Sequence, residues 1–420
     1  MRQVTGRVMP RRVRQCFQQR AWQTAGLLIT VLVVLPSVAR AQVDSGTAML
    51  APTPPMGWAN WNSLGCDYDD GKIRAIADKM VSSGMRDAGY QYVIIQECIV
   101  PFGHRDKDGT LHPDPAKFPH GIPALVAYIH SKGLKAGIYT DVGTKTCAKY
   151  EGSFQHEELD ARTFAAWGID LIEEDFCFKP DGFTAEQLYD RMRDAIARTG
   201  RPMLFYICNW GHERAWMWAP KVGNVWRSTQ DVGEPGRAEW NRILRNFDQN
   251  ALHASSGGRN HWSDPDMLEV GVPGISDVEG QSVFSLWAIS AAPLWAGNDL
   301  VSMSAKTQSI LTNRELIAVD QDPLGEPGTL VLQEETGFQI WARPLAGKDS
   351  PQAVVVFNRT AAQAKVTIRW EDLGIYGDAE VRDLWAHLDL GVLPGGYSSN
   401  VPAHSVVVLR VVPDPRQPSR

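Results

Sequence analysis

The chain has 420 residues, of which 44% are hydrophobic, and its formal net charge is −6. This length exceeds what one compact domain normally holds, so we expect more than one domain. Residues 1–41 contain seven Arg and no acidic residue, and the remainder has 35 basic against 48 acidic side chains, a net charge of −13. A surface this acidic argues against nucleic acid and anionic membranes as partners.

The first 41 residues have the pattern of a signal peptide. Six Arg between positions 2 and 20 precede an apolar run at 25–35, and Ser37-Val38-Ala39-Arg40-Ala41 offers small residues for cleavage after Ala41. The apolar run is shorter than the roughly 20 residues that span a bilayer, so an uncleaved membrane anchor is the less favoured alternative. We expect a secreted or periplasmic protein that has no membrane partner after cleavage.

Strand-like and helix-like segments alternate from residue 56 to residue 300. The expected strands lie at 56–61, 90–98, 134–142, 170–177, 202–210, 224–232, 261–268 and 293–300. Helical patterns fall between them, at 72–88, 122–132, 161–167, 185–198, 239–254 and 278–289. This α/β order predicts a closed (β/α)8 or TIM barrel as the catalytic domain, at 50–325. An open doubly wound sheet is the alternative, weakened because no Gly-x-Gly-x-x-Gly turn follows the first strand.

A different pattern begins after the turn-forming segment at 324–328. Short alternating segments follow at 329–334, 339–343, 353–358, 365–370, 380–384 and 405–412. They predict a C-terminal antiparallel β-sandwich domain at 329–413. Few chemically distinctive side chains gather there, so we expect a packing domain and not a second active site.

Polar and aromatic side chains gather where the expected barrel strands end, which is the face that carries the active site in such barrels. Two runs, at 168–177 and 224–232, are apolar and β-branched before they become acidic, as buried parallel strands are when they reach the surface. We therefore expect Asp175 and Asp231 to be the catalytic pair. The other strand ends contribute Trp61, Gln96, Glu97, Tyr139, Asp141, Glu173, Asn209, Arg227, Asp264 and Asp266.

Two carboxylates that face one small centre indicate glycoside hydrolysis. A retaining enzyme places them about 5–5.5 Å apart, and an inverting enzyme leaves a wider gap for water. The 15 Trp suit a carbohydrate substrate, because sugar rings stack on indole. A metal site made of Glu97, Glu173, Asp175 and Asp266 is the less favoured interpretation, since the strand ends offer no His cluster. We expect no metal and no cofactor.

Five cysteines remain after residue 41, at the ends of expected strands or in the loops just after them. They are Cys66, Cys98, Cys147, Cys177 and Cys208. Export permits disulfides between neighbouring loops on this rim, and one cysteine must be left over. No pair has Cys-x-x-Cys spacing, so a zinc site is not expected.

Several motifs make the chain resemble glycoside hydrolase family 27, the family of α-galactosidases and α-N-acetylgalactosaminidases. They are MGWANWN at 56–62, KFPHGI at 117–122, GIYTDVG at 137–143, KTC at 145–147, WR at 226–227 and SDPDMLEVG at 263–271. The likeness runs from about residue 54 to about residue 410. It implies that Asp175 is the nucleophile and Asp231 the acid/base of a retaining mechanism. It places in the sugar pocket Trp61, Tyr139, Arg227, Asp266 and Met267.

The same resemblance implies a disulfide pattern. Cys66 should pair with Cys98, and Cys147 with Cys177. Cys208 matches a family cysteine whose partner position here holds no Cys, so it should be a free thiol.

Four positions depart from the family's pattern. Gln96-Glu97 stand where the family usually has Asp-Asp, which grips the galactose 4- and 6-hydroxyls. Glu173 replaces a Lys two residues before the nucleophile, and Asn209 replaces Glu or Ser. Because residues i and i+2 share a strand face, Glu173 should raise the pKa of one of the two carboxylates, its own or that of Asp175. These four side chains are expected to bind and select the sugar.

The sequence thus predicts an exported retaining glycoside hydrolase, α-galactosidase-like, that cleaves terminal α-linked galactose from oligo- or polysaccharides. One alternative keeps the fold and mechanism but takes another terminal sugar, such as a β-L-arabinopyranoside or an isomaltose unit of an α-glucan. A second alternative, a carbohydrate-binding protein without catalysis, is disfavoured because both Asp175 and Asp231 are present.

Overall fold

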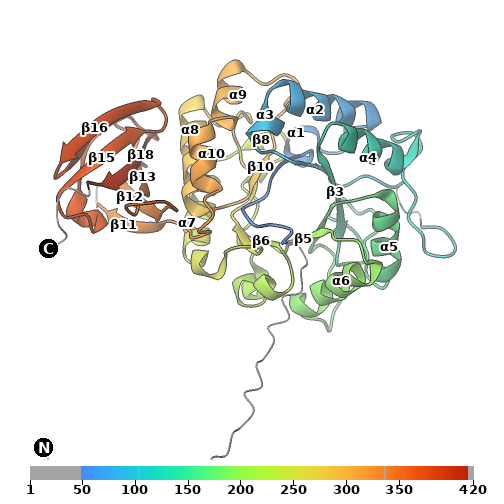
Figure 1. Cartoon of the computed structure of the whole chain (residues 1–420). Helices are drawn as coiled ribbons and strands as arrows, with labels where there is room; N and C mark the ends of the chain where they lie inside the picture. The colour runs from blue at the N-terminus through green and yellow to red at the C-terminus, as the bar shows by residue number, and fades with distance from the viewer. Residues whose placement is uncertain (1–48, 102, 104, 335–336, 415–420) are drawn as a thin grey trace, which may run out of the picture. The chain divides into compact units, whose positions relative to one another are not determined.

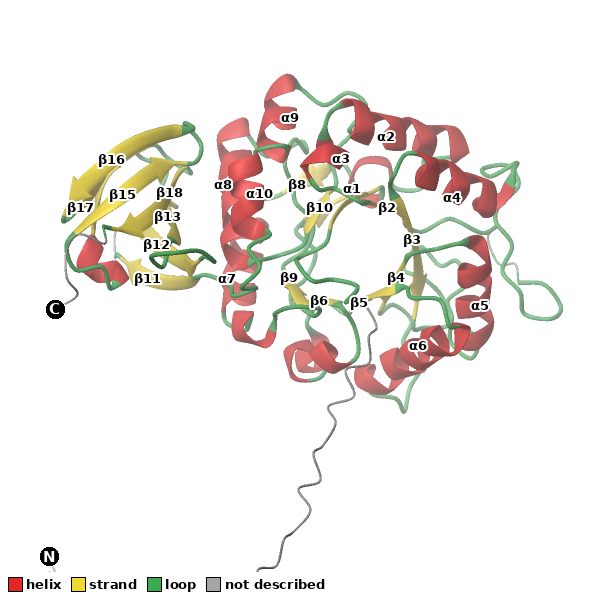
Figure 2. Cartoon of the chain, in the orientation of Figure 1, coloured by secondary structure: helices red, strands yellow, loops and turns green. Residues whose placement is uncertain are grey.

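A computed structural model describes residues 49–101, 103, 105–334 and 337–414, so the expected signal peptide lies outside the described residues. Within them, eight parallel strands form a curled sheet with helices on its outer side (Figures 1 and 2). The order of the strands is β10-β1-β2-β3-β4-β5-β6-β9. A parallel bridge between Leu268 and Ala296 links the two ends of this sheet. The predicted α/β barrel is confirmed.

The barrel strands are short and buried. They are β1 (Met56–Ala59), β2 (Tyr92–Ile95), β3 (Lys135–Asp141), β4 (Leu171–Asp175), β5 (Leu204–Cys208), β6 (Val225–Arg227), β9 (Trp262–Asp264) and β10 (Leu294–Ala296). Inside the ring the backbones approach closely at Gly57, where an added Cβ would lie 2.6 Å from the carbonyl oxygen of Tyr92 and 2.9 Å from the ring of Trp295. Only glycine fits there, because an interior packed at native density has no space for a further atom.

The helices mostly follow the expected segments. They are α1 (Trp61–Leu64), α2 (Asp70–Ser82), α3 (Met85–Ala88), α4 (Gly121–Ser131), α5 (Glu157–Trp167), α6 (Ala185–Thr199), α7 (Trp240–Ala251), α8 (Asp277–Ser290), α9 (Ala305–Leu311) and α10 (Arg314–Asp320). The single helix expected at 72–88 is wrong. It is divided into α2 and α3 because Gly84 adopts a left-handed conformation, with φ of 80°.

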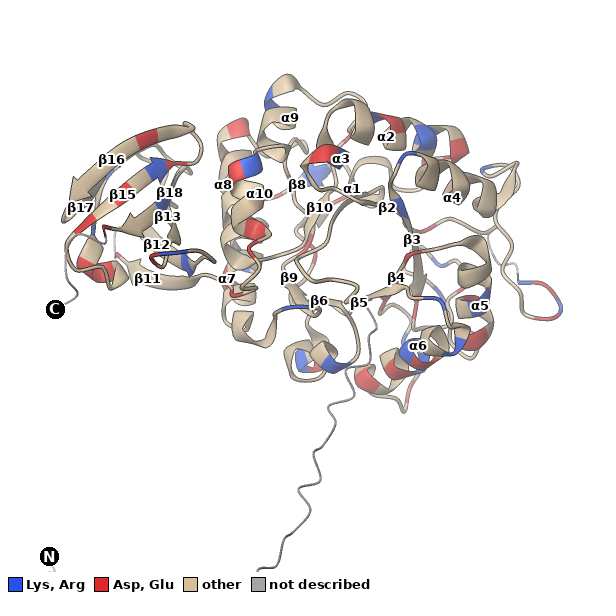
Figure 3. Cartoon of the chain, in the orientation of Figure 1, with Lys and Arg blue, Asp and Glu red and all other residues tan. Residues whose placement is uncertain are grey.

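Basic and acidic residues are interspersed along α5 and α6 (Figure 3), where Arg191 pairs with Glu157. No helix within the described ranges combines the length and apolar character needed to cross a membrane.

The C-terminal domain is antiparallel. Its larger sheet has the order β11 (Thr329–Gln333), β12 (Phe338–Pro344), β13 (Gln352–Asn358), β18 (Val406–Pro413), β15 (Asp378–Asp383) and β16 (Leu388–Pro394). A separate pair joins β14 (Ala364–Arg369) to β17 (Gly396–Val401). Ile340, Val354 and Ile368 belong to its apolar core. Arg343 of β12 donates to the carbonyl oxygen of Ala288 in α8 at 2.7 Å, so this domain packs on the barrel.

Candidate active site

A cavity of about 210 Å³ lies at the carboxyl ends of the barrel strands. It is smaller than the roughly 300–1,000 Å³ of pockets for drug-sized ligands, which suits a single sugar unit. Asp141, Asn209 and Asp264 do not line it. The other ten residues that the sequence predicts for the site do: Trp61, Gln96, Glu97, Tyr139, Glu173, Asp175, Arg227, Asp231, Asp266 and Met267. A larger hollow of about 880 Å³ lies between the barrel and the β domain. The carboxylate of Asp248 on its wall already forms an ion pair with Arg359.

Asp175 ends β4 and is 7% exposed. Strand register places it beside Asp141 of β3 and Cys208 of β5. The hydroxyl of Tyr139 donates to its Oδ2 at 2.7 Å, and the backbone N–H of Phe176 donates to its Oδ1 at 2.9 Å. Burial raises the pKa of Asp175 to about 7; the Tyr139 bond opposes this and the charge of Asp231 adds to it. This carboxylate is therefore held rigidly, with its protonation sensitive to each contact.

Both implied disulfides are present, Cys66–Cys98 and Cys147–Cys177, with Cα–Cα distances of 5.6 and 5.1 Å. Cys208 is free and buried. The predicted pairing is confirmed. Each bridge joins a loop to the end of a neighbouring strand and so stiffens the rim of the cavity.

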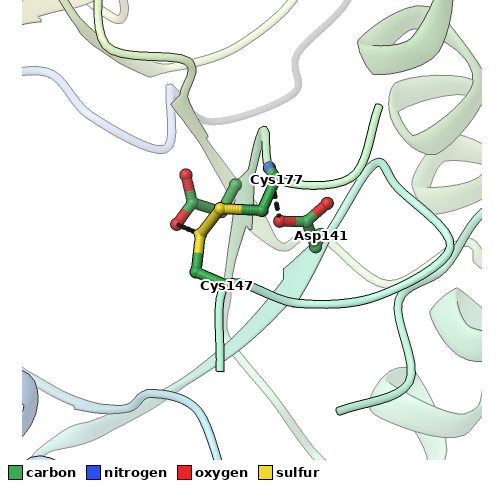
Figure 4. A group of neighbouring side chains, drawn as sticks. Asp141, Cys147 and Cys177 are labelled. Atoms are coloured by element: carbon green, nitrogen blue, oxygen red, sulfur yellow. Dashed lines mark hydrogen bonds between the residues drawn. A yellow bond between two sulfur atoms is a disulfide. The ribbon is translucent and has the colours of Figure 1, made fainter. Parts of the chain in front are cut away.

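The second bridge lies next to Asp141 and Asp175 (Figure 4). Oδ2 of Asp141 accepts the backbone N–H of Cys177 at 2.8 Å, and Sγ of Cys147 is 3.3 Å from Oδ2 of Asp175. A disulfide sulfur carries no proton, so the latter is a van der Waals contact. These four side chains are close enough to surround an ion, but both sulfurs are bonded to each other and cannot serve as thiolate ligands.

Arg227 ends β6 and joins two carboxylates of the cavity. Its Nη2 is 2.9 Å from Oδ1 of Asp231, and its Nη1 is 2.8 Å from Oδ1 of Asp266. The Arg227 side chain is 4% exposed, whereas that of Asp231 is 61% exposed. Asp231 thus lies at the mouth of the cavity while its guanidinium partner is buried beneath it. Arg227 is thus an ion-pair partner of two carboxylates and also lines the cavity.

Asp266 has a strained backbone, with φ of 98°, a value that residues other than glycine rarely adopt. Its Oδ2 accepts the N–H of Val232 at 2.8 Å, and its own N–H donates to Oδ1 of Asp264 at 2.8 Å. Burial raises the pKa of Asp266 to about 7, against the lowering effect of Arg227. Strain of this kind persists where the surrounding contacts over-determine it, as here.

Gln96 and Glu173 contact each other in the interior of the cavity. Nε2 of Gln96 lies 2.9 and 2.8 Å from the two carboxylate oxygens of Glu173. Burial raises the pKa of Glu173 to about 8, and the charge of Asp175 adds to the effect. Glu97 is held separately, because Thr146 donates its hydroxyl to Oε2 at 2.7 Å and Ala148 its backbone N–H to Oε1 at 2.9 Å.

The structure does not bring Asn209 into this cavity. Its Nδ2 donates to the carbonyl oxygen of His212 at 2.8 Å, and the residue is fully buried. Tyr206 and Cys208 of β5 line the cavity instead. Side chains alternate along a strand, so a residue next to Cys208 points away from the face that Cys208 shares with Tyr206. Asn209 is therefore not proposed as a contact of the sugar.

Other lining residues were missed. Strand alternation could have found Tyr206, whose hydroxyl donates to Asp264, since it stands beside Glu173 in the sheet register. Glu234 and Pro235 come from the hairpin of β7 (Gly233–Glu234) and β8 (Arg237–Ala238). That hairpin lies inside a loop, and no residue pattern of the sequence indicates that it faces the cavity.

Comparisons with known proteins agree with this geometry. A family model described as Alpha galactosidase A matches residues 53–322, and one described as Alpha galactosidase C-terminal beta sandwich domain matches residues 335–411. An alpha-galactosidase of Cyamopsis tetragonoloba is 41% identical over 367 residues, 87% of each chain. Alpha-galactosidase A of Cellvibrio japonicus is 42% identical over 383 residues, covering 87% of this chain and 93% of its own. The crystal structure of alpha-galactosidase I from Mortierella vinacea superposes with a TM-score of 0.82 at 35% identity, covering 87% of this chain and 98% of that one.

Proposed function

The chain belongs to glycoside hydrolase family 27, the α-galactosidase family, and from that premise we propose that it is an exported, retaining α-galactosidase. It would cleave terminal α-linked galactose from oligo- or polysaccharides. The observation that supports this most is the placement of two of the carboxylates that line one small cavity, Asp175 buried at its wall and Asp231 exposed at its mouth. The names of relatives about 40% identical over most of the chain support the sugar and the bond.

In the first step, Oδ of Asp175 attacks the anomeric carbon while Asp231 gives its proton to the glycosidic oxygen. The carbon–oxygen bond to the leaving alcohol breaks, and an ester between the sugar and Asp175 forms. In the second step Asp231 takes a proton from water, the resulting hydroxide equivalent attacks the anomeric carbon, and Asp175 departs as a carboxylate. Two inversions give net retention.

The positions of the two carboxylates suit these roles. Asp175 needs a fixed orientation, which the bonds from Tyr139 and Phe176 supply. Asp231 needs access to a leaving group that extends into solvent and later to water, which its exposed position at the mouth supplies. Arg227 holds Asp231 from below, so it orients this acid without closing the opening.

We further propose that Gln96, Glu97 and Glu173 select the sugar, because all three are buried and line the cavity near Asp175. A site built to hydrogen-bond a hydroxyl discriminates strongly against a sugar that presents the wrong one. These same residues depart from the family's usual set. A second candidate function is therefore the same mechanism acting on another terminal sugar. The two candidates are separated by the activity of the wild type on four aryl glycosides: the α-galactoside, the α-N-acetylgalactosaminide, the β-L-arabinopyranoside and the α-glucoside.

Azide tests the two roles with matched variants. In Asp175→Ala, azide can enter the vacated space and attack the activated aryl α-galactoside directly, which gives the β-galactosyl azide. In Asp231→Ala, the enzyme ester still forms and azide opens it from the other face, which gives the α-galactosyl azide. The same product from both variants, or net inversion by the wild type in NMR, would contradict the assignment. Export is tested by N-terminal sequencing of the mature protein, expected to begin after Ala41.

A further inference from the structure

The cavity contains more negative charge than its cations can balance. Among the described residues, six carboxylates line it, namely Glu97, Glu173, Asp175, Asp231, Glu234 and Asp266, and Arg227 is the single basic side chain. Both of its terminal nitrogens are occupied, by Asp231 and by Asp266. Ionised groups taken out of water are costly unless they are paired, so at least one buried carboxylate should stay neutral.

Glu173 is the carboxylate with the weakest compensation. It is 3% exposed and, within the described part of the chain, no Lys, Arg or His forms an ion pair with it. Its polar partner is the neutral amide of Gln96, with Nε2 at 2.9 and 2.8 Å from its oxygens. The backbone N–H of Trp61 donates to Oε1 of Gln96 at 3.2 Å, which fixes the amide with its NH2 group toward Glu173.

The groups that face Glu173 come from every neighbouring strand. Strand register sets Tyr139 of β3 and Tyr206 of β5 on either side of it, and both phenols are buried. Burial is the largest of the effects on the pKa of Glu173, and it raises this pKa. The charges of Asp175 and of Asp264 raise it further, while the Gln96 amide and the charge of Arg227 lower it. The raising effects outweigh the lowering ones, so the fold favours the protonated form of Glu173, with no ion-paired cation among the described residues to oppose it.

Building on the proposed function, we propose that Glu173 works as a neutral carboxylic acid, oriented by Gln96, whose O–H donates to a hydroxyl of the bound sugar remote from the anomeric carbon. Glu173 lies two residues before Asp175 on the same strand face, roughly 7 Å deeper in the barrel. With Asp175 at the anomeric carbon, Glu173 therefore meets the opposite side of the ring. Its neutrality also leaves Asp175 as the one anion of this strand face.

A spectroscopic measurement tests the protonation state without any substrate. The infrared spectrum of the wild type at neutral pH should contain the carbonyl stretch of a protonated carboxylic acid that is absent from Glu173→Gln. This difference should vanish when both proteins are measured at strongly alkaline pH. A difference spectrum that shows loss of an ionised carboxylate at neutral pH would overturn the proposal.

Kinetics test the hydrogen bond. On an activated aryl α-galactoside, which needs little acid assistance, kcat/KM of the wild type should fall at alkaline pH as Glu173 loses its proton. Glu173→Gln keeps a donor and cannot ionise, so it should stay within about tenfold of the wild type and lose this alkaline decline. Glu173→Ala should lose roughly 10- to 100-fold, because the sugar hydroxyl is left without its buried partner. Equal losses in both variants would refute the donor role.

Glu269→Gln is the matched control. Like Glu173, Glu269 is buried and accepts a hydrogen bond from a side-chain amide, that of Asn62. Burial raises its pKa to about 8, but Glu269 does not line the cavity. This variant should keep the alkaline decline; its disappearance here would overturn the assignment to Glu173. Aryl galactosides that each lack one hydroxyl then identify the partner of Glu173. Removal of the hydroxyl that Glu173 binds should lower kcat/KM in the wild type but have little further effect in Glu173→Ala. A wild type inactive on every α-galactoside, yet with the infrared difference, would refute the proposed function and leave the neutral Glu173 standing.

Discussion

Replacing Tyr139 by Phe removes one hydroxyl and leaves the aromatic ring in place. That hydroxyl donates to Oδ2 of Asp175 at 2.7 Å, in a region where Asp175 is almost fully buried. A hydrogen bond to an ionised group is worth about 1.5–3 kcal/mol. At about 1.4 kcal/mol for each pKa unit, its loss should raise the pKa of Asp175 by about 1 to 2. The sign follows because the phenol stabilises the ionised form.

The consequence is a loss that depends on pH. At pH values below the acid limb of the profile, Tyr139→Phe should lower kcat/KM roughly 10- to 100-fold, because less Asp175 is ionised. The acid limb itself should move to higher pH by about 1 to 2 pH units, the change in the pKa of Asp175. Toward alkaline pH the ratio of the variant's kcat/KM to that of the wild type should return toward one, because Asp175 is then ionised in both proteins and both share the decline that comes from Glu173. The assay is kcat/KM against pH on an activated aryl α-galactoside.

A matched variant separates this effect from general damage to the cavity. Tyr206→Phe also deletes a buried phenol that bonds a carboxylate, but that carboxylate is Asp264. It should leave the acid limb in place. A loss in Tyr139→Phe that is the same at every pH would refute the reasoning and assign the hydroxyl to contact with the sugar.

Three further predictions follow from the same contacts. Asp231→Asn should slow substrates with poor leaving groups roughly 10²- to 10⁴-fold and activated aryl glycosides far less, because the latter need little proton transfer. The joint exchange Gln96→Asp, Glu97→Asp and Glu173→Lys should lower aryl α-galactosidase activity, since it replaces a coupled set whose effects are not additive. Cys208 should be alkylated only in the unfolded protein, because the thiol is buried and burial raises its pKa.

Each of these has a clear contrary result. Equal losses of Asp231→Asn on both substrate classes would move the acid role to another residue. A triple variant that gains α-galactosidase activity relative to the other aryl glycosides would favour a different natural sugar. Alkylation of Cys208 in the native state, detected by mass spectrometry, would show that the reagent reaches this thiol through the cavity that it lines.

Local sequence patterns predicted most of the barrel but were less accurate at strand ends. The run at 224–232 was expected to be one strand that includes Asp231, whereas β6 ends at Arg227. Asp231 reaches the cavity from the loop beyond, drawn there by its ion pair with Arg227. In the β domain, β16 and β17 were missed because Gly and Pro interrupt their alternation, and pairing with β15 and β14 stabilises them despite their composition.

The sequence by itself determined the class of fold, because that depends on periodicity along each segment. Residue identity, compared with the family's pattern, identified the departures from its sugar-binding set and predicted Asp175 and Asp231 as the catalytic pair. Tertiary structure alone decided which of those residues meet. Gln96 and Glu173 are 77 positions apart, and only the pairing of β2, β3 and β4 brings the amide to the acid. Burial also raised the pKa of Glu173, since a carboxylate has its ordinary pKa until the fold removes its water and sets its neighbours.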